Sequence, residues 1–197
     1  YETSLLDKKT RILSRIEKFT DFHLGLKNIA QSKKLLEILE DLVGEECILF
    51  KEKINFKQSG GNGFRTHQDI VSRWDDFASY FMNIFITVDE CTIENGCLQV
   101  ASGGHKGPLR KLFTKENGKM IMEELNNKPF PATDTILEVK KGTLVLLHGR
   151  LPHYSCENKS SKSRHAYTTH IIDGRASYPD TNWLQRPNMP LKGFVDE

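Results

Sequence analysis

The sequence predicts a mainly β protein with flanking helices, in which helical segments come first and a run of strands follows. Amphipathic helical periodicity covers the beginning of the chain, and segments rich in Ile, Val, Phe, Tyr and Thr follow it. Gly, Asp and Asn separate these segments, as they do in the turns between antiparallel strands. An antiparallel β core with helices on one side is a sandwich, a jelly roll or a barrel.

Residues 1–45 are expected to form the helical part. Apolar residues recur at steps of three and four from Leu5 to Phe19, and again from Leu35 to Leu42. We expect a break near Gly25 and take Gly44 as the stop signal of the second helix. The two amphipathic helices should pack on the rest of the domain.

The β core begins at residue 46. Five strands are expected, at Cys47–Phe56, Tyr80–Val88, Cys97–Ala101, Thr143–Leu147 and Arg164–Ile172. Residues 103–134 are polar, with one short helical candidate at Lys119–Leu125. Because long excursions from a compact domain are usually functional, we expect 103–134 to be a lid over the site.

Composition narrows the class of protein. The chain has 197 residues, which suits one domain, and Lys+Arg 28 against Asp+Glu 26 leaves a net charge of +2. Nucleic-acid-binding proteins usually carry a larger basic excess, so we expect no nucleic-acid partner. No apolar run approaches the roughly 18 residues of a membrane span, so we expect no membrane partner. The four Cys include no C-x-x-C pair, which argues against a disulfide scaffold or a zinc knuckle.

The segment Thr66-His67-Gln68-Asp69 carries the first candidate metal ligands. In an extended segment, side chains two residues apart point to the same side, so His67 and Asp69 can reach one metal ion. Further along, His148 and His153 each offer a second imidazole. Two His and one carboxylate on one face, with open positions opposite, form the facial triad of non-haem Fe(II) oxygenases.

Arg164 points to an anionic co-substrate for such a metal. It begins an apolar strand, where an arginine is costly unless it meets an anion. A guanidinium matches a carboxylate with two parallel hydrogen bonds, and Ser155 can add a third. A dicarboxylate satisfies both demands, and we infer 2-oxoglutarate. Its 2-oxo acid end would chelate iron and its far carboxylate would meet Arg164.

Several short motifs, in one order over roughly residues 48–186, make the sequence resemble the phytanoyl-CoA dioxygenase family of Fe(II)/2-oxoglutarate oxygenases. Besides the first metal motif and Arg164, they are Thr92-Ile93-Glu94-Asn95-Gly96-Cys97-Leu98, Ser102-Gly103-Gly104-His105, Gly142-Thr143-Leu144-Val145-Leu146-Leu147-His148, His153-Tyr154-Ser155-Cys156-Glu157-Asn158 and Asn182-Trp183-Leu184-Gln185. The resemblance implies a double-stranded β-helix, a cupin-like jelly roll. The single oxygenase domain 1–197 would then have its jelly-roll core at 46–186 and a tail at 187–197.

The resemblance also implies which histidine binds iron. In the family, the metal His is followed by a hydroxyl residue or Gly two positions later and by the co-substrate arginine eleven positions later. His153 has Ser155 and Arg164 at these positions, and His148 does not. The implied ligands are therefore His67, Asp69 and His153, while His148 is left to packing or to hydrogen bonding behind the ligands.

Less specific patterns indicate further residues of the site. Asn55 resembles a position where relatives hydrogen-bond 2-oxoglutarate, and Phe85 aligns with an aromatic residue that lines the co-substrate pocket. Trp74, in a loop soon after the metal motif, and Arg65 are candidates for contacts to the substrate. His170 has no spacing argument and is expected to be structural.

The predicted function is that of a 2-oxoglutarate-dependent dioxygenase that hydroxylates a small molecule and converts 2-oxoglutarate to succinate by oxidative decarboxylation. It would use Fe(II), 2-oxoglutarate and O2, with ascorbate as reductant. Related halogenases carry a small residue where this chain has Asp69, so the carboxylate favours hydroxylation; desaturation and ring chemistry stay open. Two alternatives are a non-catalytic cupin-like binding protein of the same fold and a zinc hydrolase with the same ligands, and Arg164 argues against both.

The sequence leaves the substrate and the oligomeric state open. The substrate can be an acyl-CoA, an amino-acid-like solute or a specialised metabolite, and the protein a monomer or a homodimer. Unpaired cysteines fit a cytoplasmic enzyme that keeps iron ferrous. Because family members run longer and this chain starts at Tyr1, we expect a further segment to precede it.

Overall fold

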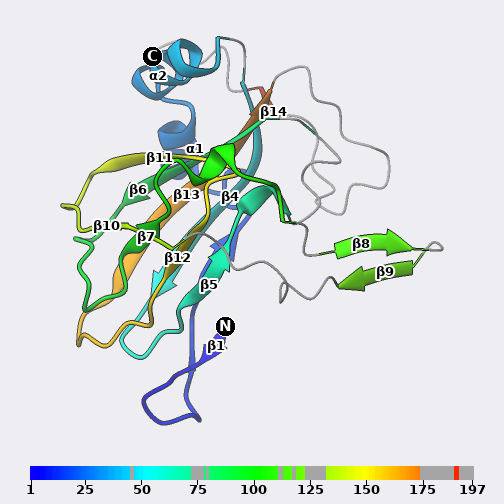
Figure 1. The fold of residues 1–197 in the computed structure, drawn as a ribbon. Helices are drawn as coiled ribbons and strands as arrows, with labels where there is room; N and C mark the ends of the chain where they lie inside the picture. The colour runs from blue at the N-terminus through cyan, green and yellow to red at the C-terminus, as the bar shows by residue number, and fades with distance from the viewer. Residues whose placement is uncertain are drawn as a thin grey trace.

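Two antiparallel sheets form the centre of the computed structural model (Figure 1). The large sheet has the strand order β11-β6-β13-β4-β14, with β3 also paired to β4, and the small sheet has the order β10-β7-β12-β5. The mainly β jelly roll that the sequence predicts is confirmed. The residues that the structure describes are 1–44, 47–71, 78, 80–110, 113–116, 119–122, 132–173 and 189–190.

The five strands expected from their apolar and β-branched residues are present, and no strand end is shifted by more than one residue. They are β4 (Cys47–Lys57), β6 (Phe81–Thr87), β7 (Leu98–Val100), β11 (Leu144–His148) and β13 (Arg164–Asp173). The sequence missed four further strands in the two sheets besides β3, namely β5 (Phe64–His67), β10 (Thr135–Leu137), β12 (His153–Ser155) and β14 (Met189–Pro190). These strands have two to four residues, too few to show a clear period of two.

The helical prediction is wrong for the first part of residues 1–45. That part contains β1 (Glu2–Thr3), β2 (Arg11–Ile12) and β3 (Arg15–Glu17). Asp7 accepts hydrogen bonds from the backbone of Lys9 and Thr10 at 2.9 Å and so forms a turn between β1 and β2. Leu6 and Ile16 are exposed, so the helical spacing of apolar residues here does not mark a buried face.

Of the two predicted helices only the second is present, as α2 (Lys33–Val43); α1 (Leu24–Ala30), which precedes it, was not expected. The break lies between Ala30 and Lys33 rather than near Gly25, which is inside α1; His23 accepts a hydrogen bond from the Leu26 N–H and so begins that helix. Gly44 ends α2 with a φ of 73°, a left-handed conformation that glycine adopts readily. Neither helix in the described part of the chain is long and apolar enough to cross a membrane.

The helices cover one face of the large sheet. Leu35 and Leu39 of α2 pack with Leu49, Ile84 and Ile171 in one apolar cluster. The Tyr167 hydroxyl of β13 donates to the Leu26 carbonyl of α1 at 2.9 Å. The opposite face of the large sheet is therefore the one that looks toward the small sheet.

The segment 103–134 contains the short 3-10 helix η3 (Gly104–Lys106) and two strands, β8 (Phe113–Glu116) and β9 (Lys119–Met122), which pair with each other. The helical candidate Lys119–Leu125 is therefore wrong for 119–122, and its last residues lie outside the described part. Most of the rest of this segment also lies outside it, so the lid stays a prediction.

Replacing Leu39 by Ala should lower the free energy of unfolding by about 2–5 kcal/mol, because its fully buried side chain ties α2 to the large sheet. Leu42→Ala is the matched control, since Leu42 lies on the same helix with 56% of its surface exposed and should change stability by less than about 0.5 kcal/mol. Urea unfolding measures both, and equal losses in the two variants would contradict the packing described here.

Candidate metal centre and adjoining pocket

His67, Asp69 and His153 each offer one ligand atom, and these three atoms lie within 4.8 Å of one another. His67 ends β5, Asp69 begins the short 3-10 helix η1 (Asp69–Val71), and His153 begins β12. Because β5 and β12 are neighbours in the small sheet, with His153 directly opposite His67, strand pairing brings together residues that are far apart in the sequence. The three residues singled out from the sequence thus form one cluster.

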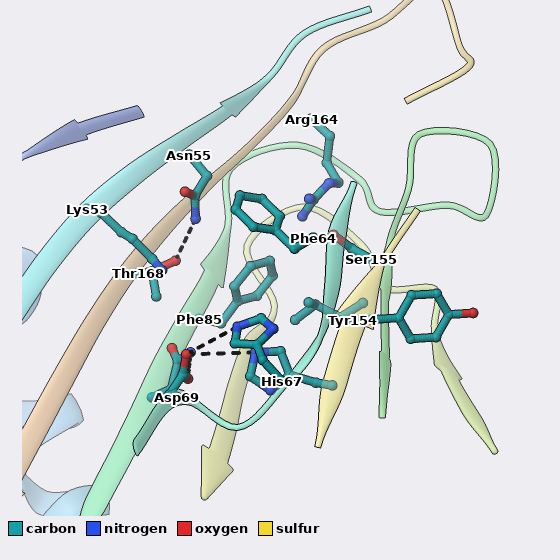
Figure 2. Close-up of a pocket in the computed structure, with 13 residues that line it drawn as sticks. Lys53, Asn55, Phe64, His67, Asp69, Phe85, Tyr154, Ser155, Arg164 and Thr168 are labelled. Carbon is teal, nitrogen blue, oxygen red and sulfur yellow. Dashed lines mark hydrogen bonds and ion pairs between the residues drawn. The ribbon is translucent and has the colours of Figure 1, made fainter. Parts of the chain in front are cut away.

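Both histidine rings are oriented by the carbonyl group two residues before them. His67 Nδ1 lies 2.7 Å from the Arg65 carbonyl oxygen, and His153 Nδ1 lies 2.9 Å from that of Leu151. A protonated Nδ1 donates to such a carbonyl, which leaves the lone pair of Nε2 for a metal ion. The two Nε2 atoms lie 3.6 and 3.9 Å from Asp69 Oδ1 (Figure 2).

Asp69 is held from the other side by the large sheet. Asn83 donates its amide hydrogen to Asp69 Oδ2 at 2.9 Å, and His170 Nε2 lies 3.5 Å from the same oxygen. This leaves Oδ1 directed at the two imidazoles. Sequence reasoning missed Asn83 and treated His170 as merely structural. The period of two was the available signal, since Asn83 shares a strand face with Phe85, and His170 with Arg164.

The donor set suits a divalent transition metal, because two imidazole nitrogens and one carboxylate oxygen converge with room opposite. Burial raises the pKa of Asp69, but the charge of His153 and hydrogen bonds from His170 and His67 outweigh it and hold this pKa well below its usual range. Burial lowers the pKa of His153 and so favours the neutral, metal-binding imidazole. The pKa of His67 is raised instead: burial lowers it, but the hydrogen bond to Asp69 and the charge of Asp69 outweigh this effect, so a metal ion would displace a proton from this imidazole.

A pocket that is partly open to solvent adjoins the cluster. All four residues expected at the co-substrate line it together with the three candidate ligands: Asn55, Phe85, Ser155 and Arg164. Figure 2 shows Arg164 and Ser155 at one end of this pocket and His67 and Asp69 at the other. The structure therefore places a candidate metal centre and a buried arginine at opposite ends of one cavity.

Arg164 is buried at the end of the pocket away from the candidate ligands. It is 2% exposed, and its Nε and Nη1 atoms are buried without a hydrogen-bond partner among the described residues. Its guanidinium lies 5.9 Å from the centre of the Phe85 ring. Asn55 donates to Thr168 Oγ1 at 3.4 Å, while its own Oδ1 has no partner in the same part of the structure. Buried donors without partners are costly, so this end of the pocket suits an anionic ligand.

The remaining candidates lie elsewhere. The Arg65 side chain is exposed and does not line the pocket, although its carbonyl orients His67. Trp74 lies outside the described residues. His148 stays outside the metal cluster: its ring packs against Tyr80 and His105, and its Nδ1 accepts a hydrogen bond from the Arg150 backbone at 3.1 Å.

Solved structures share this fold. The non-heme alpha ketoglutarate dependent carbocyclase SnoK from nogalamycin biosynthesis matches with a TM-score of 0.72 and 18% identity, over 96% of this chain and 81% of that one. The epimerase SnoN, solved in complex with Fe3+, alpha ketoglutarate and nogalamycin RO, matches with a TM-score of 0.69 and 17% identity, over 91% and 75%. At such identities the likeness shows the fold alone.

Some relatives are more similar to this chain in sequence than these solved structures are. A 2-aminoethylphosphonate dioxygenase from uncultured bacterium HF130_AEPn_1 is 37% identical over 84% of this chain and 61% of its own length. A phytanoyl-CoA dioxygenase from Arabidopsis thaliana is 33% identical over 86% and 60%. The chain thus spans about six tenths of the length of these two relatives. The model of the Phytanoyl-CoA dioxygenase (PhyH) family matches residues 6–166, and the chain belongs to this family.

Proposed function

We propose that this chain is a non-haem Fe(II)/2-oxoglutarate-dependent dioxygenase that hydroxylates a small molecule. The observation that carries the proposal is the buried Arg164, whose Nε and Nη1 atoms have no hydrogen-bond partner among the described residues and which lines the same pocket as a two-histidine, one-carboxylate cluster. A metal-binding protein or a zinc hydrolase has no need of both features. Membership of the family supports the same function.

In this proposal His67, Asp69 and His153 hold iron. The bound iron would supply the oxidising chemistry that couples decarboxylation of 2-oxoglutarate by O2 to hydroxylation of the substrate, with succinate as the second product. The roles of the protein are to fix the ligand atoms, to orient the co-substrate and to keep water away. Asn83 and His170 fix Asp69, so that one carboxylate oxygen faces the metal and the other stays bonded to the sheet.

The co-substrate would lie along the inner face of the large sheet. Arg164 and Ser155 would bind its far carboxylate, and Asn55 would offer its amide between the two ends. Phe64, Phe85 and Leu98 add apolar surface to the same pocket, which limits water near the metal. Phe64 was not expected from the sequence.

The substrate is proposed to be small. The relative named for 2-aminoethylphosphonate makes this aminophosphonate the first compound to test, ahead of amino-acid-like solutes and acyl-CoA thioesters. Arg65 and Trp74 remain predicted substrate contacts.

Succinate formation tests the function. Incubated with Fe(II), ascorbate, O2, 2-oxoglutarate and a panel of these compounds, the protein should form succinate and an equal amount of hydroxylated product, measured by mass spectrometry. A protein that binds 2-oxoglutarate but forms no succinate with any member of a broad panel is the non-catalytic alternative. Absence of 2-oxoglutarate binding to the metal-loaded protein would refute the proposal.

Asp69→Ala should weaken metal binding by at least about 100-fold, because even residues that only orient ligands contribute about 10- to 100-fold. Titration with Mn(II), followed by its electron paramagnetic resonance signal, measures this without turnover. Asp41→Ala is the control, since Asp41 is an exposed carboxylate on α2. Unchanged Mn(II) affinity in Asp69→Ala would remove Asp69 from the ligand set.

Arg164→Met should raise the Kd of the Mn(II)-loaded protein for 2-oxoglutarate by about 100-fold, as expected for a charge-assisted bidentate hydrogen bond. Mn(II) affinity itself should stay within about threefold of wild type, because Arg164 lies at the far end of the pocket. Calorimetry measures both constants, with Arg11→Met as the exposed control. A variant that loses metal binding and co-substrate binding together would point to misfolding rather than to this role.

A further inference from the structure

Lys57 is a buried cation that the proposed function does not yet use. It ends β4 directly opposite Arg164 of β13, and it is only 3% exposed. Its Nζ donates hydrogen bonds to Ser155 Oγ at 2.8 Å, to the Cys156 carbonyl at 2.5 Å and to the Gly96 carbonyl at 3.2 Å. Two cations therefore lie side by side behind the far end of the pocket.

The three acceptors match the chemistry of an ammonium group. An ammonium has three N–H donors and no acceptor, whereas a neutral amine has only two donors. All three donors of Lys57 are used by the protein, so Lys57 has none left for a ligand. Lys57 itself is not among the residues that line the pocket, but Ser155 and Arg164 are. Any effect of Lys57 on a ligand must therefore act through Ser155 or through its charge.

The turn that carries Gly96 closes tightly on this lysine. Gly96 has a φ of +74°, and a Cβ added there would lie 2.3 Å from the Cys156 carbonyl oxygen and 3.0 Å from Lys57 Nζ. Only glycine permits this approach, which brings the Gly96 carbonyl within reach of the ammonium. The lysine is thus enclosed by three separate segments: β4, the 92–97 turn and the end of β12.

The hydrogen bond to Ser155 has a directional consequence. Because Ser155 Oγ accepts a hydrogen bond from Lys57, its own hydroxyl can donate a hydrogen bond in another direction. The pocket that Arg164 lines lies in that direction. Burial and the neighbouring charge of Arg164 lower the pKa of Lys57 to about 7. An anion bound between these groups would stabilise both charges.

We propose that Lys57 is a positioning residue for the co-substrate: it orients the Ser155 hydroxyl toward the far carboxylate of 2-oxoglutarate and adds a second positive charge behind that carboxylate. The inference rests on the proposed function and deepens it. It assigns to Lys57 the preference for a dicarboxylic 2-oxo acid over a monocarboxylic one, a property that a merely structural lysine would not affect.

Binding of two 2-oxo acids distinguishes a positioning role of Lys57 from a merely structural one. 2-Oxopentanoate has the same chain length as 2-oxoglutarate but a methyl group in place of the far carboxylate. In the Mn(II)-loaded protein, Lys57→Met should raise the Kd for 2-oxoglutarate by about 10- to 100-fold, the size of one hydrogen bond to a charged group. The Kd for 2-oxopentanoate should change by less than about twofold. Calorimetry measures both, and Lys140→Met, with a side chain that is 90% exposed, controls for the lost charge.

Ser155→Ala completes a double-mutant cycle. If Lys57 acts through Ser155, the loss caused by Lys57→Met should be clearly smaller in the Ser155→Ala background than in wild type. Should Lys57→Met fail to fold, Lys57→Gln keeps two donors without the charge and takes its place in the cycle.

The outcomes are distinct. An unchanged preference for 2-oxoglutarate, or equal weakening of both 2-oxo acids, would overturn the role of Lys57 while leaving the proposed function intact. Fully additive losses in the cycle would refute the part of this role that acts through Ser155. Failure of the wild-type protein to bind 2-oxoglutarate would instead overturn the proposed function itself.

Discussion

The carboxylate of Asp69 links the two sheets of this protein through polar contacts at the metal end of the pocket. One oxygen is bonded to Asn83 on the large sheet, and the other faces the two imidazoles carried by the small sheet. A carboxylate that is only 7% exposed is costly unless hydrogen bonds and positive charge surround it. The site is arranged to meet this demand, and a metal ion between the three ligands meets it further.

The inner face of the large sheet carries an unusual amount of positive charge for the interior of a jelly roll. Lys53, Asn55 and Lys57 alternate along β4, and Arg164 lies opposite Lys57. Burial lowers the pKa of Lys53 and the charge of Asp69 counteracts this, whereas at the other end burial and the charge of Arg164 both lower the pKa of Lys57. Such a face is stabilised by an anion that binds only the folded state. The same feature that weakens the fold therefore favours the ligand.

The strands that could be predicted from the sequence are mostly the long ones. β4, β6 and β13 were predictable because they are long enough for apolar and β-branched residues to stand out. β5 and β12 were missed as strands, although they carry His67 and His153, because they are short and mostly polar, unlike the equally short β7, and because they pair with each other. The candidate ligands His67, Asp69 and His153 were nevertheless singled out, since the spacing of His, Asp and Arg follows metal and carboxylate chemistry rather than strand propensity. The apolar residues between Leu5 and Phe19 misled because helical spacing arises by chance in an irregular segment whose turn is set by Asp7.

The sequence by itself determined which side chains share a face, because the period of two is a local property of any strand. Lys53, Asn55 and Lys57 had to point the same way, as did Arg164 and His170. It did not determine which face is enclosed, since a row of lysines is more often solvated. The tertiary structure decided that. The helix α2 covers the apolar face with Leu35 and Leu39, so the polar face is closed off by the small sheet and becomes the pocket. Only packing between distant segments could place Asn83, His170 and Lys57 behind the residues that the motifs had already indicated.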